Sequence, residues 1–503
     1  MDNEYLHSLR TTLDFLSAEG EVLSTDEEVD PICEIAGILK SLENGPSIVF
    51  NKIKGYPGVR NVGNLFARIE RVAKMFGVNN PGELKLKCRK ALKNPLPASI
   101  VKEAPCQEVV IADNVDVSKI LPIIKHTKFD GARILGGGVV LAMGEYYNSG
   151  NDLSFKRLSF RGKDWASIAV ERTSHLGVIR FTKHRKDKIP LTINIGAPPS
   201  IMTVAATLFP KTIVPIGSDE VGMAGALQGF PVELCRAKTV DAYAVANAEW
   251  VLEGYYLPDR VWESEEAEKL GEQGVAPLMP EWTRYMGKAY MHRKFQVTAI
   301  THRKDRPFFF TPLADSFETD NMALPWREAC FLELADRIAP GLAVDVSVPY
   351  GTGWGSGIVF KVKKRGLADE GLQRNILLAA LGAQHGLRLA IAVDEDVDIH
   401  NTDDLLWAIS TRSGPPRSFI RGAPGSAGQA LQPAEAHELE GWTGFFGGIG
   451  IDATIPFGIR DKFQRAHYPV DSVELDRFFS LESIAKAKAQ QCEYARTLAD
   501  MGG

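Results

Sequence analysis

Apolar residues recur at three- and four-residue intervals in the first part of the chain. Leu9, Leu13 and Leu16 follow this spacing, and so does a second series, Val62, Leu65, Ile69 and Val72. Such spacing places side chains on one face of an α-helix. The region from 1 to 112 is therefore predicted to hold short helices mixed with short strands, an N-terminal α/β region.

The middle of the chain carries strand patterns instead. Its short runs are either continuously apolar or alternate apolar and polar residues: 134–143 (ILGGGVVLAM), 155–160, 191–195 (LTINI) and 308–310. Both patterns, bounded by loop residues, are typical of β-strands. With one apolar helix expected near 201–208, we predict a β-rich domain from 113 to 325.

The last third alternates helix and strand. Asp369 is placed to cap a helix that Gly386 would end, and whose apolar face is Leu372, Ile376, Leu377 and Leu381. A strand at 387–393 and a helix at 403–409 follow, an order that predicts an α/β domain from 326 to 503. A final helix at 482–500 mixes polar and apolar residues, which fits docking on a neighbouring subunit.

Composition is that of a globular enzyme. The 503 residues predict roughly two to four domains, and the overall fold class is α/β. A net charge of −5 argues against a nucleic-acid partner, because neutralising phosphates needs a basic excess. The six cysteines form no CxxC pair, and residues 1–9 lack the apolar core of a signal peptide. No run approaches about 18 apolar residues, so we expect a cytoplasmic protein without a membrane span.

The residues alone leave the chemistry open. Common nucleotide, zinc-protease and esterase motifs are absent, and the glycines at 136–138 sit in an apolar run, where close packing explains them better than phosphate binding. His175 and Glu220 are of residue types that can bind metals, but nothing else in the residues marks them as ligands. A lone histidine is more often structural. On this basis the chain is a multi-domain α/β enzyme of undefined reaction.

Two neighbouring stretches carry a more specific signal. Residues 393–399 read VDEDVDI and 404–412 read DLLWAISTR. Together they resemble the VDDDIDI and DVxWAxxTR signature of the UbiD family of decarboxylases. Further stretches resemble the same family, namely 121–122 with 130–131, 220–227, 246–254 and 450–454. Within the family the chain looks most similar to the protocatechuate-decarboxylase-like branch.

The resemblance implies a fold and a cofactor. UbiD-like enzymes have a central split β-barrel that binds prenylated FMN, and a C-terminal α/β domain that assembles homodimers or homohexamers. The flavin is supplied by a flavin prenyltransferase and held through a divalent metal, manganese or magnesium, with potassium beside it. The expected reaction is the reversible, non-oxidative decarboxylation of a phenolic or N-heteroaromatic acid, which releases carbon dioxide.

The resemblance also implies site residues. Arg157 matches the family's catalytic arginine, and counting back from it puts Asp152 at the first metal-ligand position, with Asn151 as the alternative. His175, in the pair Ser174–His175, and Glu220 match the other two ligands. Two oxygens and one imidazole suit a borderline-hard ion such as manganese. The implied cofactor-binding set is Asp152, Arg157, Ser174, His175, Lys211 and Glu220.

Glu281 matches the family's proton-donating glutamate. It would protonate carbon once the carboxylate has left, which requires a pKa raised by an apolar pocket. Leu278, Met279 and Trp282 are expected to form that pocket. The family's first glutamate is replaced by Ala276, which would leave Arg157 and Glu281 as a pair.

Two further positions bear on ligands. The family's phosphate-binding lysine falls on Gly448, so Lys211 or Arg157 with the metal would have to meet the phosphate charge. A loop at 315–322 is expected over the flavin, with Glu318, Asn321 and Arg327 as candidate substrate contacts.

Two alternative functions stay open. The protein could be the catalytic subunit of an aromatic carboxylase, or a flavin-free scaffold protein that kept the fold.

Overall fold

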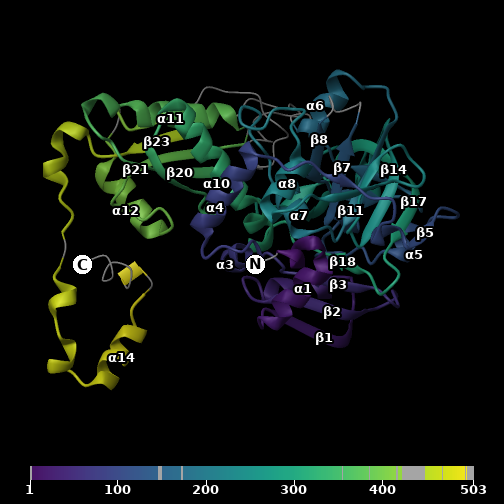
Figure 1. Cartoon of the computed structure of the whole chain (residues 1–503), viewed down its shortest axis with the longest axis horizontal. Helices are drawn as coiled ribbons and strands as arrows, with labels where there is room; N and C mark the ends of the chain where they lie inside the picture. Colours follow the sequence, from purple (N-terminus) through teal and green to yellow (C-terminus); the bar gives the residue numbers. More distant parts are fainter. Residues whose placement is uncertain are drawn as a thin grey trace.

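A computed structural model describes residues 3–495, except 145–149, 172–173, 354, 385, 415–416, 422–447, 467 and 493. Figure 1 shows three regions in chain order, with an N-terminal sheet in purple, a large central sheet in teal and a C-terminal α/β layer in green. The predicted α/β fold class is confirmed. None of the described helices combines the length and the apolar character needed to cross a membrane.

The N-terminal region is a four-stranded sheet with the order β1-β2-β3-β18. Its strands are β1 (Val22–Val29), β2 (Ser47–Ile53), β3 (Arg60–Gly63) and β18 (Phe308–Phe310), and its helices are η1 (Glu4–His7), α1 (Leu9–Ala18), α2 (Glu34–Ser41), α3 (Ile69–Met75) and α4 (Pro81–Lys93). One prediction is wrong here, because Val62 lies in β3 rather than in a helix. The strand predicted at 308–310 is present as β18, and it pairs with β3.

The central region is a nine-stranded sheet with the order β6-β9-β10-β17-β14-β11-β7-β8, and β5 pairs with β17. Its strands are β5 (Val109–Ile111), β6 (Ile134–Leu135), β7 (Gly138–Met143), β8 (Asn151–Phe155), β9 (Leu158–Phe160), β10 (Trp165–Ile168), β11 (Ile189–Ile195), β14 (Trp250–Trp262) and β17 (Met291–His302). The end strands β6 and β8 do not pair with each other in the described part of the chain. The sheet is therefore open, and a split barrel stays a prediction.

Shorter elements surround this sheet. They are β4 (Ser99–Ile100), η2 (Pro105–Gln107), α5 (Val117–Ile120), α6 (His175–Thr182), α7 (Pro199–Ala205), α8 (Glu220–Gln228), β12 (Glu233–Arg236), β13 (Tyr243–Val245), α9 (Glu265–Leu270), β15 (Pro277–Pro280) and β16 (Met286–Lys288). Apolar side chains of the sheet, such as Val140, Leu191 and Ile193, are almost fully buried in one large core. That core supplies the rigid frame on which the polar groups described below are mounted.

The C-terminal layer is a five-stranded sheet with the order β19-β20-β21-β23-β22. Its elements are α10 (Phe317–Ile338), β19 (Ala343–Ser347), η4 (Tyr350–Thr352), β20 (Gly357–Val362), η5 (Leu367–Asp369), α11 (Leu372–Ala383), β21 (Leu389–Asp394), α12 (Thr402–Arg412), β22 (Phe419–Arg421) and β23 (Ile449–Ala453). The boundary predicted between 325 and 326 falls inside α10. Asp369 is not the cap of α11, because Gly371 holds that position and the Asp369 carboxylate binds Arg365.

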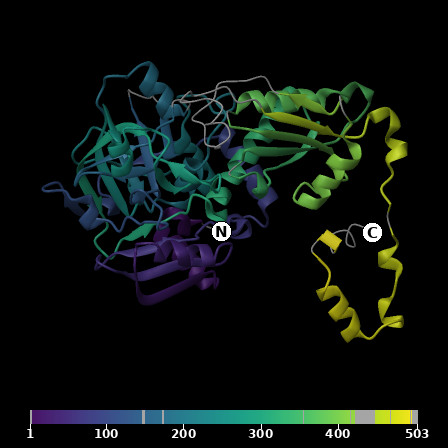
Figure 2. The ribbon, with the colours of Figure 1, turned by 180° about the vertical axis from the view of Figure 1, so that it is seen from behind.

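After the last strand the chain leaves the C-terminal layer. It continues through η6 (Phe457–Phe463), η7 (Val470–Ser472) and η8 (Leu475–Arg477) to α14 (Leu481–Ala489). Of the helix predicted at 482–500, residue 493 and residues 496–500 lie outside the described residues. The yellow ribbon of Figure 1 and the reverse view in Figure 2 both show this segment extending away from the rest of the molecule.

Candidate active site

A cavity of about 300 Å³ lies in the central region. Strand β8, the starts of α6 and α8, the β15–β16 hairpin and the first turns of α10 contribute to its lining. Two polar clusters face it. One consists of Asp152, His175 and Glu220, and the other is centred on Arg157 and Glu281. Apolar side chains such as Val170, Phe209 and Met322 form much of the remaining wall, so the cavity resembles a small-molecule site.

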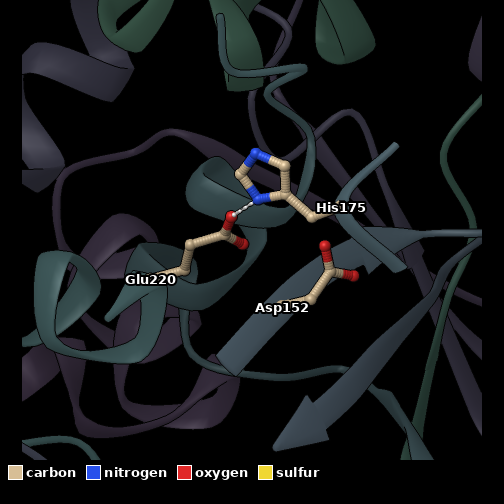
Figure 3. Close-up of side chains that lie close together, drawn as sticks. All are labelled: Asp152, His175 and Glu220. Carbon is tan, nitrogen blue, oxygen red and sulfur yellow. Dashed lines mark hydrogen bonds and ion pairs between the residues drawn. The ribbon is translucent and has the colours of Figure 1, made fainter. Parts of the chain in front are cut away.

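The first cluster brings together three elements that are distant in sequence (Figure 3). Asp152 lies on β8, His175 is the first residue of α6 and Glu220 is the first residue of α8. One ligand atom from each lies within 4.8 Å of the others, and all three residues are buried. His175 Nδ1 lies 2.9 Å from Glu220 Oε1, while Glu220 Oε2 accepts a hydrogen bond from the Leu153 amide at 2.7 Å.

The chemistry of this cluster fits a divalent cation. Burial lowers the pKa of His175, but the hydrogen bond and charge of Glu220 outweigh it, so the pKa is raised. Burial raises the pKa of Glu220, and the nearby Asp152 adds to this effect. His175 Nε2 is buried and has no hydrogen-bond partner among the described residues. Two carboxylates crowded around an imidazole with an unsatisfied nitrogen form a donor set that a cation would neutralise.

Helix capping explains why neighbouring polar residues are not in the cluster. Ser174 caps α6 by accepting a hydrogen bond from the Gly177 amide at 3.1 Å, and it also borders the cavity. Asn151 faces the start of α8, where its carbonyl oxygen accepts from the Val221 amide and its amide nitrogen donates to Asp219. The structure therefore places Asp152, and not Asn151, beside His175.

The second cluster contains one more carboxylate than the sequence predicted. Arg157 donates to both oxygens of Glu263, at 2.8 Å from Nε and 2.9 Å from Nη2, and its Nη1 donates to Glu281. The prediction that Arg157 and Glu281 form a pair on their own is therefore wrong. Glu263 follows β14 directly, and only 1% of its side chain is exposed. In the sequence it stands beside the exposed acids of α9, and no local pattern separates it from them.

The β15–β16 hairpin positions Glu281. The Glu281 amide donates to Tyr285 O, which closes the turn. A Cβ atom on Gly287 would lie only 2.5 Å from Glu281 Cγ, so the glycine leaves room for the acid. Burial raises the pKa of Glu281; Arg157 opposes this effect, whereas the charges of Glu263 and Glu171 support it. Met279 and Trp282 border the cavity as predicted, while Leu278 packs in a separate apolar core.

A histidine that the sequence did not single out also lines the cavity. His292, on β17, lies with Nε2 3.6 Å from Glu263 Oε2, and this nitrogen has no hydrogen-bond partner among the described residues. Burial lowers the pKa of His292 to about 4, so the imidazole is neutral at physiological pH. A neutral histidine beside a carboxylate can offer one hydrogen bond without adding charge.

The residues predicted to contact substrate lie elsewhere. Glu318 accepts hydrogen bonds from the amides of Asn64 and Phe66, and burial raises its pKa to about 7. The Asn321 side chain donates to Phe66 O and accepts from the Tyr350 hydroxyl, and Arg327 donates to Gly355 O. None of the three predicted contacts is among the described cavity residues, whereas Thr319 and Met322 of the same helix are.

Ala276 and Gly448, the two positions that depart from the family pattern, both lie in closely packed surroundings. Ala276 is buried in an apolar core. Gly448 has no room for a side chain, because a Cβ atom there would lie 2.5 Å from Leu381 Cδ2 and 2.7 Å from Leu387 O. Lys211 lies near enough to the first cluster for its charge to act on the pKa of His175, so it stays a candidate for phosphate binding.

Family comparisons agree with this architecture. A family model described as the 3-octaprenyl-4-hydroxybenzoate carboxy-lyase Rift-related domain matches residues 99–314, and models of the N-terminal and C-terminal domains of the same carboxy-lyase match 13–86 and 320–453. The chain belongs to the UbiD family of carboxy-lyases, as the sequence motifs predicted.

Three individual proteins illustrate what this chain is similar to. The gallate decarboxylase of Lactiplantibacillus plantarum is 32% identical over 466 residues, which cover 88% of this chain and 93% of the relative. The apo 3,4-dihydroxybenzoic acid decarboxylase of Enterobacter cloacae has a TM-score of 0.80 at 30% identity, covering 94% and 98% of the two chains. An evolved dimeric form of HmfF from Pelotomaculum thermopropionicum, in complex with prFMN, has a TM-score of 0.79 at 27% identity, covering 94% and 100%.

Proposed function

We propose that this protein is a prenylated-FMN-dependent decarboxylase of hydroxylated benzoic acids. The observation that carries the proposal is the pairing of Arg157 with Glu281 in an apolar cavity that also holds the acid–histidine cluster. The relatives named as gallate and dihydroxybenzoate decarboxylases support a phenolic acid as substrate. The reaction is reversible in principle, with carbon dioxide as the second product.

The cavity offers a place for the flavin and its metal. Asp152, His175 and Glu220 would hold a divalent ion, manganese or magnesium, whose charge would help to offset that of the flavin phosphate, and potassium is a further expected ion. Lys211 would add positive charge in place of the missing family lysine. When bound, the flavin supplies an electron sink for the charge left by decarboxylation. A flavin prenyltransferase would supply this cofactor.

The protein's own groups would handle the carboxylate and the proton. Arg157 can orient the substrate carboxylate, since a guanidinium binds carboxylates with fixed geometry. Glu263 holds this arginine in place through two hydrogen bonds. Glu281, whose pKa is raised by burial, can act as the acid that delivers a proton to the ring carbon. Trp282 and Met279 would exclude water around that transfer.

A decarboxylation screen tests the proposal. The protein is co-expressed with a flavin prenyltransferase, and loaded enzyme is incubated with gallate, 3,4-dihydroxybenzoate and 4-hydroxybenzoate while product phenols are measured by chromatography. We expect turnover of at least one acid, and none by a Glu281→Gln variant. Enzyme that carries the flavin but decarboxylates none of these acids would contradict the proposed substrate class.

The same experiment separates the alternatives. A flavin-free scaffold would show no visible absorbance after co-expression, and a carboxylase would incorporate labelled bicarbonate into a phenol faster than it releases carbon dioxide. We also propose a cytoplasmic homo-oligomer, a dimer or hexamer, in line with the dimeric form described for one structural neighbour.

A further inference from the structure

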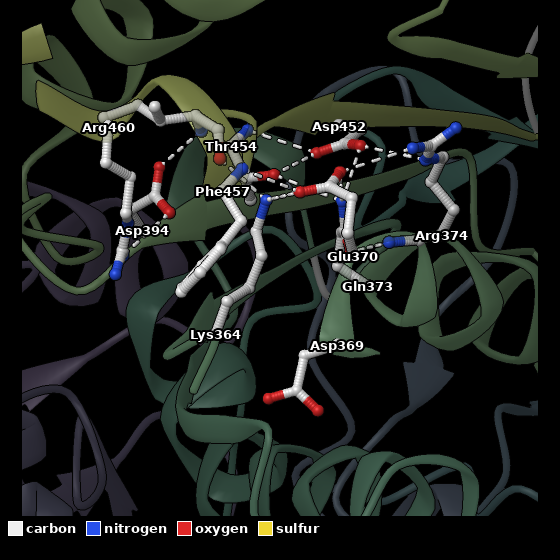
Figure 4. A network of polar contacts seen from close by, with 12 residues as sticks. Lys364, Asp369, Glu370, Gln373, Arg374, Asp394, Asp452, Thr454, Phe457 and Arg460 are labelled. Atoms are coloured by element: carbon white, nitrogen blue, oxygen red, sulfur yellow. Dashed lines mark hydrogen bonds and ion pairs between the residues drawn. The ribbon is translucent and has the colours of Figure 1, made fainter. Parts of the chain in front are cut away.

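A network of polar contacts lies outside the active-site cavity, in the C-terminal layer (Figure 4). The buried Lys364, which follows β20, donates to Glu370 at 2.9 Å and to Ile455 O at 2.7 Å. Asp394, at the end of β21, accepts from the Ile455 amide at 2.7 Å. These donors and acceptors satisfy one another. The network therefore fastens the segment that follows β23 to the ends of the neighbouring strands.

A second cavity, of about 270 Å³, lies between the N-terminal and central regions. Its walls come from the loop after β2, from α5 and the residues that follow it, from the segment before β6, from the end of β9 and from the start of α9. No described residue lines both this cavity and the active-site cavity. The second cavity is therefore a separate site, and its volume suits a ligand with about one ring.

Arg133 brings to the second cavity a positive charge that is not spent on an acid. Among the described residues, no carboxylate oxygen lies within 4.0 Å of its guanidinium. Its Nη1 donates to the Tyr56 hydroxyl at 3.4 Å, and that hydroxyl donates to Ser118 O at 2.7 Å. The nearby Asp30 is bound by Lys54 at 2.8 Å instead. A guanidinium has five N–H groups, so Arg133 keeps donors for a ligand.

The net charge of the lining also favours an anion. Arg161 is held in place, since its Nη2 donates to Glu268 at 2.8 Å and its Nη1 donates to Trp262 O at 3.4 Å. Glu265 borders the cavity as well, but it is exposed, so water screens its charge. Two arginines thus face one solvated glutamate in the lining. A divalent cation would meet the charge of Arg133 and is disfavoured here.

Apolar side chains form the remaining walls of the second cavity. Leu121 and Ile123 are buried, and the aromatic rings of Phe160 and Tyr56 are half-buried. Such walls favour a planar apolar ring. A carboxylate matches the guanidinium of Arg133, because two parallel N–H groups can bind its two oxygens. A free phosphate would bind the arginine but leave the apolar walls without contact, so the lining fits an aromatic carboxylate better.

We propose that the second cavity is a binding site for a small aromatic carboxylate, with the carboxylate on Arg133 and the ring against the apolar walls. The Gly131 amide, in the lining, donates to Leu278 O at 2.9 Å. A ligand in this cavity therefore lies beside β15, the strand that leads to Glu281, and not in contact with the reacting groups. The ligand class follows from the lining alone and does not depend on the proposed decarboxylase function.

Titration of the full-length protein with 4-fluorobenzoate, followed by fluorine NMR, tests the proposal. Wild type is compared with Arg133→Gln, with Ala132→Phe, which fills the cavity but keeps its charge, and with Arg236→Gln, an exposed arginine that borders neither cavity. We expect Arg133→Gln and Ala132→Phe each to bind one probe molecule fewer per chain than wild type and Arg236→Gln. A wild type that binds no probe, or an Arg133→Gln variant that binds as many molecules as tightly, would overturn the proposal.

An Arg157→Gln background separates the second cavity from the active site, whose arginine could also hold the probe. Arg157→Gln protein should still bind 4-fluorobenzoate, and adding Arg133→Gln should raise the Kd roughly 10-fold or more, as for loss of a hydrogen bond to a charged group. 4-Fluorobenzyl alcohol, which keeps the ring but lacks the charge, should bind Arg157→Gln protein at least about 10-fold more weakly than the acid. Binding that is lost in Arg157→Gln but kept in Arg133→Gln would place the probe in the active-site cavity and refute the second site. Because no turnover is measured, this outcome is independent of the decarboxylation screen.

Discussion

Replacing Glu263 with glutamine removes one negative charge from a guanidinium that holds two carboxylates. Arg157 lies 2.8 Å from Glu263, and at an effective dielectric constant of about 20 Coulomb's law gives roughly 6 kcal/mol for charges at this distance. Removing one partner of a buried pair costs about 3–5 kcal/mol because the remaining charge loses its compensation, and here Glu281 still compensates part of the charge of Arg157. Glutamine keeps the shape and one hydrogen bond, and we therefore expect a folded protein whose free energy of unfolding is lower by about 3 kcal/mol.

The effect that tests the proposed mechanism is the change in the pKa of Glu281. In the wild type, Arg157 is largely neutralised by Glu263, and the charge of Glu263 also helps to raise the pKa of Glu281. In Glu263→Gln the whole positive charge of Arg157 acts on Glu281, which stabilises its ionised form and lowers its pKa. The other charged or titratable neighbours stay the same: Glu171, Tyr290 and His292. Glu281 must be protonated to act, so activity is present below its pKa and lost as pH rises through it.

The assay is the pH dependence of kcat on a phenolic acid with flavin-loaded enzyme. We expect the alkaline limb to move to lower pH in Glu263→Gln, and kcat at pH 7 to fall roughly 10- to 100-fold while flavin occupancy stays near wild type. Glu265→Gln, two residues further on and exposed, is the matched control and should leave the profile unchanged. An alkaline limb that stays in place or moves upward would refute this role for Glu263.

Three further substitutions test the remaining parts of the site. Glu281→Gln should keep the flavin but lower turnover by about 10²-fold or more; near-normal activity at equal flavin occupancy would exclude Glu281 as the proton donor. His175→Ala should lose metal and flavin, measured by elemental analysis and absorbance, while melting like the apo protein; full retention of both would make His175 a purely structural residue. Gly287→Ala should displace Glu281 and lower kcat more than it lowers the melting temperature, because the new Cβ would lie 2.5 Å from Glu281 Cγ; unchanged kcat would show that the hairpin adapts.

Local pattern determined much of the architecture. The alternation of LTINI gave β11, the periodicity after Gly371 gave α11, and the run LRLAIAV gave β21, because each is an amphipathic or buried element whose spacing shows directly in the sequence. The family motifs allowed Asp152, His175 and Glu220 to be predicted as neighbours although 68 positions separate the first from the last, and the structure brings them together. Their metal-binding role remains a prediction.

The tertiary structure determined those contacts that no local sequence pattern indicates. Glu263 reaches Arg157 across 106 positions because β14 ends beside the β8–β9 turn, and nothing near Glu263 in the sequence distinguishes it from the solvated acids that follow. Glu318 and Asn321 looked like loop residues over a ligand, but they lie in α10 and satisfy backbone groups of the 64–66 turn that would otherwise be buried without partners. Pairing of this kind depends on which segments meet in space, and that is set by the packing of the whole chain rather than by any residue's neighbours in sequence.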